Sequence, residues 1–100
     1  METATTIDGS SATIALVGNL TVATTPDLEA AFAELPEGVA DITLDLSRLD
    51  YVASAGLRVI VSQAKKAREN GGSVRLENPN DEVMEVLDVT GLVEILEITQ

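Results

Sequence analysis

The chain opens with two short runs of residues that favour extended structure. Residues 3–7 and residues 12–17 are rich in threonine, valine, isoleucine and alanine, a composition typical of β-strands. Between them, Asp8-Gly9-Ser10-Ser11 has the composition of a tight turn. The pattern predicts an opening hairpin, and Gly18 and Asn19 are expected to break its second strand.

A helix is predicted after this hairpin. The segment beginning at Thr24 combines a capping threonine with Pro26 in the first turn and the acidic Asp27 behind it, which is typical of a helix start. Pro36 and Gly38 are expected to end the helix. Apolar residues recur at helical spacing between these limits and predict a buried stripe made of Leu28, Ala31, Phe32 and Leu35.

The middle of the chain changes from a strand period to a helix period. Residues 41–46 alternate polar and apolar side chains, as a half-buried strand does. From Leu57 the apolar positions (57, 60, 61, 64 and 67) fit a helix that ends near Asn70, before Gly71-Gly72. Ser54 is therefore expected at or next to the N-terminal cap of this helix.

The last third of the chain predicts a strand, a helix and an undecided tail. Residues 73–76 form the strand, and the helix starts after Asn78-Pro79 and ends at Gly91. Val83, Val86 and Leu87 are expected to face inward. Residues 92–98 fit a strand or a short amphipathic helix, and the pattern leaves both open. The order of elements predicts an α/β fold, a mixed sheet with helices packed against it, in one domain over residues 1–100.

Ser54 permits two interpretations. A serine oxygen at a helix start can accept a hydrogen bond from an unpaired N–H group, and such a cap contributes about 1 kcal/mol. Alternatively, the hydroxyl carries a phosphate, whose charge would meet the positive end of the helix dipole. Ala55 and Gly56 favour the second interpretation modestly, because their small side chains leave the amides of the first turn open.

Charge and composition limit the partners and the location of the protein. The net charge of −11 works against binding to nucleic acid or to an anionic membrane, and it favours a basic partner or serves solubility. No apolar run approaches the roughly 18 residues of a membrane span. The first residues lack the basic and apolar regions of a signal peptide, and there is no cysteine. We expect a cytoplasmic protein without membrane insertion.

The residues needed for common catalytic and metal sites are missing. The chain contains neither histidine nor cysteine, so Ser54 cannot belong to a Ser-His-Asp triad. A lysine base is also ruled out, because Lys65 and Lys66 lie roughly 16 Å further along the helix. No phosphate-binding loop or EF-hand spacing is present. The sequence predicts a protein that is not an enzyme and has no cofactor or metal.

Four segments in order resemble the STAS domain of bacterial anti-sigma factor antagonists: residues 16–20, 44–52, 54–60 and 89–92. The resemblance implies that Ser54 is phosphorylated by the anti-sigma factor, itself a serine protein kinase. It further implies that only the unphosphorylated form binds this kinase, and that a phosphatase restores it. We expect a monomer or weak homodimer. The implied partner-binding residues are Asn19, Thr21, Tyr51, Val52, Ala53, Ser54, Ala55, Gly56 and Arg58.

The same comparison leaves alternatives open. Family members often have an acidic residue where this chain has Ala53, and also in the loop that here holds Asn19 and Thr21. This favours, as an alternative, a STAS interaction subunit of a transporter or stress-sensing complex that is not phosphorylated. Direct binding of a small anion or nucleotide at the helix start is a third hypothesis. Tyr51 and Val52 are expected to form an exposed contact core, and Leu57 either joins them or is buried.

Overall fold

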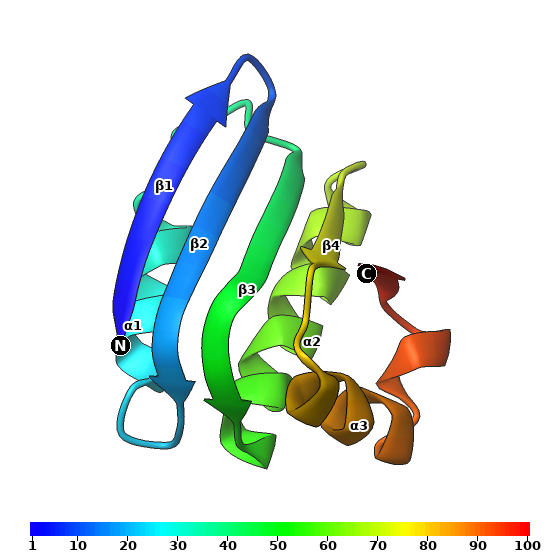
Figure 1. The fold of residues 1–100 in the computed structure, drawn as a ribbon. Helices are drawn as coiled ribbons and strands as arrows, with labels where there is room; N and C mark the ends of the chain where they lie inside the picture. The colour runs from blue at the N-terminus through cyan, green and yellow to red at the C-terminus, as the bar shows by residue number, and fades with distance from the viewer.

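A computed structural model describes all 100 residues as one five-stranded sheet with helices on one face (Figure 1). The predicted α/β fold with a mixed sheet is therefore confirmed. The elements in chain order are β1 (Glu2–Asp8), β2 (Ser11–Leu20), α1 (Thr25–Ala33), β3 (Asp41–Val52), α2 (Ser54–Glu69), β4 (Ser73–Glu77), α3 (Asp81–Val89), a 3-10 turn (Leu92–Glu94) and β5 (Glu97–Thr99).

The strands follow one another across the sheet in the order β1-β2-β3-β4-β5. β1 and β2 form the predicted antiparallel hairpin, whereas β2, β3, β4 and β5 run parallel. The parallel strands are joined by crossovers that carry α1, α2 and α3. Because the carboxyl ends of β2 and β3 lie at the same edge of the sheet, the loop before α1 and the start of α2 lie side by side there (Figure 1).

β2 and β3 are both longer than the pattern predicts. Gly18 and Asn19 do not break β2, which continues to Leu20, and β3 continues beyond residue 46 to Val52. Their pairing shifts twice, between Ala15 and Val17 and again between Gly18 and Asn19, and each shift adds one extra residue to β3. These β-bulges change the side-chain period of β3, so its buried positions are Leu44, Leu46, Leu49 and Val52.

An aspartate stabilises the first bulge. The N–H of Ser47 donates to Oδ1 of Asp45 over 3.0 Å. This backbone hydrogen bond is the main reason that the pKa of the Asp45 carboxyl lies below its ordinary value, and side-chain hydrogen bonds from Ser47 and Asn78 act in the same direction. The charged form of Asp45 therefore favours the local shape of β3.

The core lies between the sheet and its helices. Alternate residues of the central strands, among them Ile14, Leu44 and Leu76, are fully buried and meet the apolar stripes of α1, α2 and α3. Most predicted inward residues are buried, but Leu35 and Val86 are only half-buried. α1 ends at Ala33, earlier than Pro36 and Gly38 predict, so Leu35 lies beyond the helix and outside its buried stripe. No helix combines the length and apolar composition needed to cross a membrane.

Residues 92–98, for which the pattern leaves a strand and a short helix open, contain one of each in succession. Leu92–Glu94 form a single 3-10 turn, and Glu97–Thr99 form a short parallel strand beside β4. Gly91 begins this segment with a φ of 76°, a left-handed conformation that glycine adopts without strain. Leu96, between the two elements, is buried and attaches the tail to the core.

Candidate functional site

Ser54 is the first residue of α2 and not its cap. The cap is Ala53, whose extended backbone (φ −95°, ψ 164°) precedes the helix and whose side chain offers no oxygen to the first turn. The Ser54 side chain is exposed, and its hydroxyl takes part in none of the side-chain hydrogen bonds of the chain. The interpretation of Ser54 as a helix cap is therefore wrong, because the helix begins one residue too early for its oxygen to serve this role.

Some backbone N–H groups at this helix start are hydrogen-bonded and others are not. The N–H of Ala53 donates to the carbonyl of Leu20 over 2.8 Å, and the carbonyl of Ala53 accepts from Gly56 and Leu57 at 2.9 and 3.2 Å. The N–H groups of Ser54 and Ala55 have no backbone partner. Two donors at the positive end of α2 thus remain available beside the Ser54 hydroxyl.

Three candidate contact residues turn out to belong to the core. Val52 is only 2% exposed, because the second bulge in β3 turns its side chain towards the helices. The expectation that Val52 is exposed is therefore wrong, and Leu57 is also buried. Gly56 is buried against Leu20, and a Cβ atom at Gly56 would lie 2.6 Å from Leu20 Cδ2. Its lack of a side chain lets α2 approach β2 closely.

The loop between β2 and α1 is held by its own threonines. Thr24 Oγ1 donates to the carbonyl of Asn19 and accepts from the N–H of Thr21, both over 2.8 Å. Thr24 therefore stabilises the loop and makes no side-chain cap bond to α1, contrary to the predicted capping role. Asn19 is exposed and Thr21 half-exposed, and the Ala53–Leu20 hydrogen bond brings this loop beside the start of α2.

Three exposed apolar side chains lie on elements at the same end of the molecule as Ser54. Tyr51 is 48% exposed, Val22 in the neighbouring loop is 75% exposed, and Val89 at the end of α3 is 79% exposed. A hollow joins the end of β3 to α3 and is lined by Tyr51, Val52, Glu82, Glu85, Val86, Val89 and Thr90. Neither Val22 nor Val89 is among the predicted contact residues, although position 89 lies off the buried stripe of Val83 and Leu87.

A second hollow lies along α2 and includes Ser54 itself. Its lining residues are Ser54, Leu57, Arg58, Val61, Ser62, Lys65, Thr90 and Leu92. Thr90 lines both hollows, and its hydroxyl donates to the carbonyl of Val86 over 2.8 Å. The two hollows therefore adjoin at Thr90 and differ in charge: carboxylates line the one on α3, and cations line the one on α2.

The position of α3 beside β3 depends on Asn80. Its side chain accepts from the N–H of Val83 over 2.8 Å, which caps α3, and donates to the carbonyl of Leu49 over 3.0 Å. One amide group thus stabilises the helix start and attaches α3 to β3. Because β3 carries Tyr51 and α3 carries Val89, this attachment fixes the distance across the first hollow.

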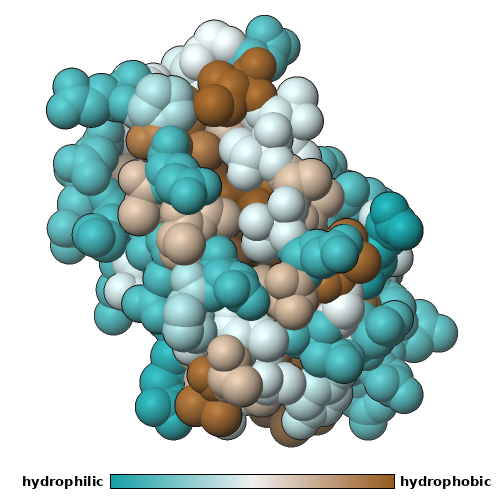
Figure 2. All heavy atoms as spheres, turned by 90° about the vertical axis from the view of Figure 1, so that its left-hand side faces the viewer, coloured by the Kyte–Doolittle hydropathy of each residue, from teal (hydrophilic) through white to brown (hydrophobic).

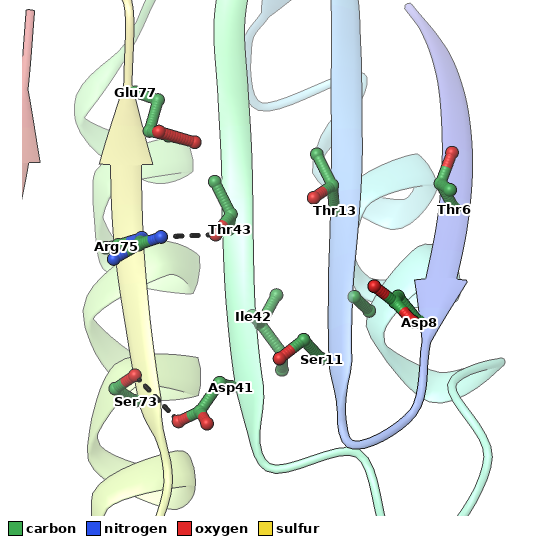
Figure 3. A pocket seen from close by; sticks show the side chains of 11 residues that line it. Thr6, Asp8, Ser11, Thr13, Asp41, Ile42, Thr43, Ser73, Arg75 and Glu77 are labelled. Carbon is green, nitrogen blue, oxygen red and sulfur yellow. Dashed lines mark hydrogen bonds between the residues drawn. The ribbon is translucent and has the colours of Figure 1, made fainter.

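A polar hollow on the opposite face of the sheet is separate from this site. Figure 3 shows Thr6, Thr13, Thr43 and Arg75 side by side on four strands, in register across the sheet. Arg75 Nε donates to Thr43 Oγ1 over 3.3 Å, and Ser73 Oγ donates to Asp41 over 3.1 Å. These groups lie towards the amino ends of the parallel strands, away from Ser54, and they pair with one another across strands.

The side of the molecule along β1 has no continuous apolar surface. Figure 2 views this side and shows hydrophobic atoms in separate spots among hydrophilic ones. Every residue of β1 is exposed, and Ile7, at the far end of the sheet from Ser54, is 47% exposed. No group of three or more acidic side chains is arranged to hold a metal ion.

The matches to known proteins extend over nearly the whole chain. The family model described as "Mlab, STAS domain" matches residues 3–97. The anti-sigma-B factor antagonist of Bacillus subtilis strain 168 is 33% identical over 84 residues, covering 84% of this chain and 77% of the relative. Among solved structures, TM1081 of Thermotoga maritima has a TM-score of 0.90 at 27% identity, covering 98% of this chain and 86% of its own.

A more distant structure shares the fold. SpoIIAA, an anti-sigma factor antagonist from Bacillus, has been solved in unphosphorylated and phosphorylated forms. The unphosphorylated form has a TM-score of 0.84 at 19% identity, covering 99% of this chain and 89% of its own. The phosphorylated form has a TM-score of 0.74, covering 99% and 92%.

Proposed function

The chain belongs to the STAS-domain family, and we propose that it is an anti-sigma factor antagonist that phosphorylation of Ser54 switches off. Its partner in this proposal is an anti-sigma factor with serine kinase activity, and a phosphatase reverses the modification. The observation that carries the proposal is the exposed, unbonded hydroxyl of Ser54 at the uncapped start of α2. A hydroxyl that stabilises no helix is available for modification without damage to the fold.

The phosphorylation step requires nothing from this chain except the hydroxyl. Ser54 Oγ forms a bond to the γ-phosphorus of ATP held by the kinase, the bond from that phosphorus to ADP breaks, and the hydroxyl proton passes to a base of the kinase. The antagonist is thus a substrate and a binding module, and it supplies no catalytic group.

The switch follows from the charge added at one point of the surface. Before modification, the kinase meets a neutral hydroxyl next to the hollow that holds Tyr51 and Val89, whose exposed apolar surfaces gain from burial. A phosphoryl group adds about −1.5 to −2 charge, which the same contact would have to desolvate. The expected result is a loss of affinity without unfolding, because Ser54 lies outside the core.

Charge also favours a partner of a particular kind. The net charge of −11 and the two carboxylates beside Tyr51, Glu82 and Glu85, suit a basic surface on the kinase. Such complementarity mainly increases the association rate and falls with salt. The proposed partner residues exposed towards it are Tyr51, Asn19, Arg58 and Ser54, whereas Val52 and Gly56 support them from the core.

Calorimetry with a purified candidate anti-sigma factor kinase from the same genome tests the proposal. We expect Ser54→Ala to bind as tightly as the wild type and Ser54→Asp to bind at least about tenfold more weakly. Ser10→Asp is the matched control, since it adds the same charge to an exposed serine in the far turn of the sheet. Equal affinity of Ser54→Asp and wild type would contradict the proposal that phosphorylation of Ser54 weakens binding.

Phosphorylation itself is tested by incubation with the same kinase and ATP. We expect the intact mass to rise by about 80 Da, the mass of one phosphoryl group, and Ser54→Ala to stay unmodified. Tight binding without any mass increase would instead favour the alternative of an interaction subunit that is not phosphorylated. The missing acidic residue at position 53 motivates that alternative.

A further inference from the structure

Arg58 lies one helical turn after Ser54 on the same side of α2. Residues four apart on a helix are neighbours, and a negative group on the N-terminal side of a positive one is the favourable order. Both side chains are exposed, and both line the hollow along α2. A group attached to Ser54 Oγ would therefore enter the space that the Arg58 guanidinium can reach.

Arg58 has no anionic partner in the chain. The only ion pair joins the amino terminus to Asp27, and the only carboxylate on α2 is Glu69, at the far end of the helix. The neighbours of Arg58 three and four residues away are Ser54, Ala55, Val61 and Ser62, none of which is charged. The first turn of α2 also contains no acidic residue.

We propose that Arg58 is the internal receptor of the phosphoryl group on Ser54. The planar guanidinium can donate two parallel hydrogen bonds to phosphate oxygens, a geometry that lysine cannot provide. This inference rests on the proposed phosphorylation of Ser54 and adds a residue that recognises the modified state. Phosphorylation then has two effects on the binding surface. The phosphate adds negative charge, and it also occupies the arginine one turn after Ser54.

The other charges near Ser54 favour Arg58 over any competitor. Lys65 lines the same hollow, but it lies three turns along α2, roughly 16 Å away by helical rise. On α3, Glu82 and Glu85 line the adjoining hollow and repel a phosphate. The phosphate is therefore attracted towards α2 and repelled from α3. Arg58 is the cation on α2 that lies within one helical turn of Ser54.

Occupation of Arg58 changes what the partner meets. In the unmodified protein the guanidinium is free to pair with an acidic group of the kinase. In the modified protein it is turned to the phosphate of its own chain. We therefore expect Arg58→Gln to weaken binding of the unmodified protein by about threefold, the size of an exposed ion pair.

Phosphorus NMR of protein with phosphoserine encoded at position 54 tests the proposal without any kinase. Arg58 stabilises the dianion, so the second phosphate pKa should lie about 0.3 pH units lower in wild type than in Arg58→Gln. The matched controls Lys65→Gln and Arg68→Gln remove the same charge from the same helix and should titrate like the wild type. Equal titration of wild type and Arg58→Gln would overturn the proposal, as would an equal shift in either control.

A second measurement needs no substitution and covers the case in which Arg58→Gln does not fold. The Nε–H resonance of Arg58 should move on phosphorylation, while that of Arg68 should not. An unchanged Arg58 resonance would overturn the proposal. Since the phosphate is encoded, these results are independent of the kinase: failure of the kinase to modify Ser54 would contradict the proposed function and leave the Arg58 result standing.

Discussion

The N–H of Ala53 donates to the carbonyl of Leu20 over 2.8 Å, and this bond connects the start of α2 to the end of β2. Leu20 is fully buried and also packs against Gly56 in the first turn of α2. The exposed Ser54 is thus attached on both sides to a core residue of a different strand. Its position is set by the core and not by a flexible loop.

The cap of α2 gives a prediction about stability. Because Ala53 occupies the cap position with a suitable extended backbone, Ala53→Ser should supply the missing oxygen and raise the free energy of unfolding by about 1 kcal/mol. Ser54→Ala should change it by less than about 0.5 kcal/mol, as for other exposed positions. Urea denaturation followed by circular dichroism measures both.

Ser62→Ala, an exposed serine inside the same helix, is the control for helix propensity. The opposite pattern, a loss of about 1 kcal/mol in Ser54→Ala with no gain in Ala53→Ser, would mean that Ser54 caps the helix in solution.

The contact between Gly56 and Leu20 predicts a steric cost. Gly56→Ala should place its methyl group into the Leu20 side chain and lower the free energy of unfolding by about 1–3 kcal/mol, despite the better helix propensity of alanine. The double variant with Leu20→Ala should show a favourable coupling of at least about 0.5 kcal/mol relative to the sum of the single changes. Additive effects would show that the two residues do not clash.

Local patterns predicted the hairpin, the three helices and the order of the elements, because each depends on periodicity and turn residues nearby in the sequence. They failed where the structure depends on a distant strand. Leu46, Leu49 and Val52 are three residues apart, a spacing that does not fit an unbroken strand. Only the pairing of β3 with β2 shows that two bulges produce it.

The candidate site shows the same division. The sequence places Ser54 and Arg58 on one helix, but it predicts the cap of this helix only to within one residue. That residue decides whether the Ser54 hydroxyl is free. The sequence pattern indicates that Val89 is exposed, because it lies off the apolar stripe of α3. The pattern does not indicate that Val89 lies near Tyr51, because this depends on the Asn80 side chain joining α3 to β3.

Asn80 predicts coupled effects on stability and on the site. Asn80→Ala removes the cap of α3 and leaves the carbonyl of Leu49 without its donor, so the free energy of unfolding should fall by about 1–3 kcal/mol. The amide resonances of Tyr51 and Val89 should shift as α3 moves. Asn70→Ala, which loses one exposed bond at the end of α2, serves as control and should leave both resonances in place.

Asp45 predicts a dependence on pH. Its pKa is lowered in the folded protein, chiefly by the N–H of Ser47, so its charged form stabilises the fold above the unfolded pKa, and this contribution is lost as pH falls through the folded pKa. Asp45→Asn should lower the free energy of unfolding by about 0.5 kcal/mol at pH 7. The difference from wild type should shrink below about pH 4.

Asp50→Asn, on the exposed part of the same strand, is the control for a change of charge. A difference between Asp45→Asn and wild type that stays constant from pH 7 to pH 3 would contradict the role of the Asp45 carboxylate.

The exposed apolar residues near Ser54 predict where the partner binds. Val89 is 79% exposed, so Val89→Asp should leave the melting temperature within about 2 °C, since exposed substitutions rarely change stability. It should weaken binding to the anti-sigma factor by about tenfold or more, because it places a charge in the contact. Ile7→Asp is the matched control, an exposed apolar side chain at the opposite end of the sheet. If Ile7→Asp weakened binding and Val89→Asp did not, the partner would bind at the far end, and the Ser54 surface would not be the interface.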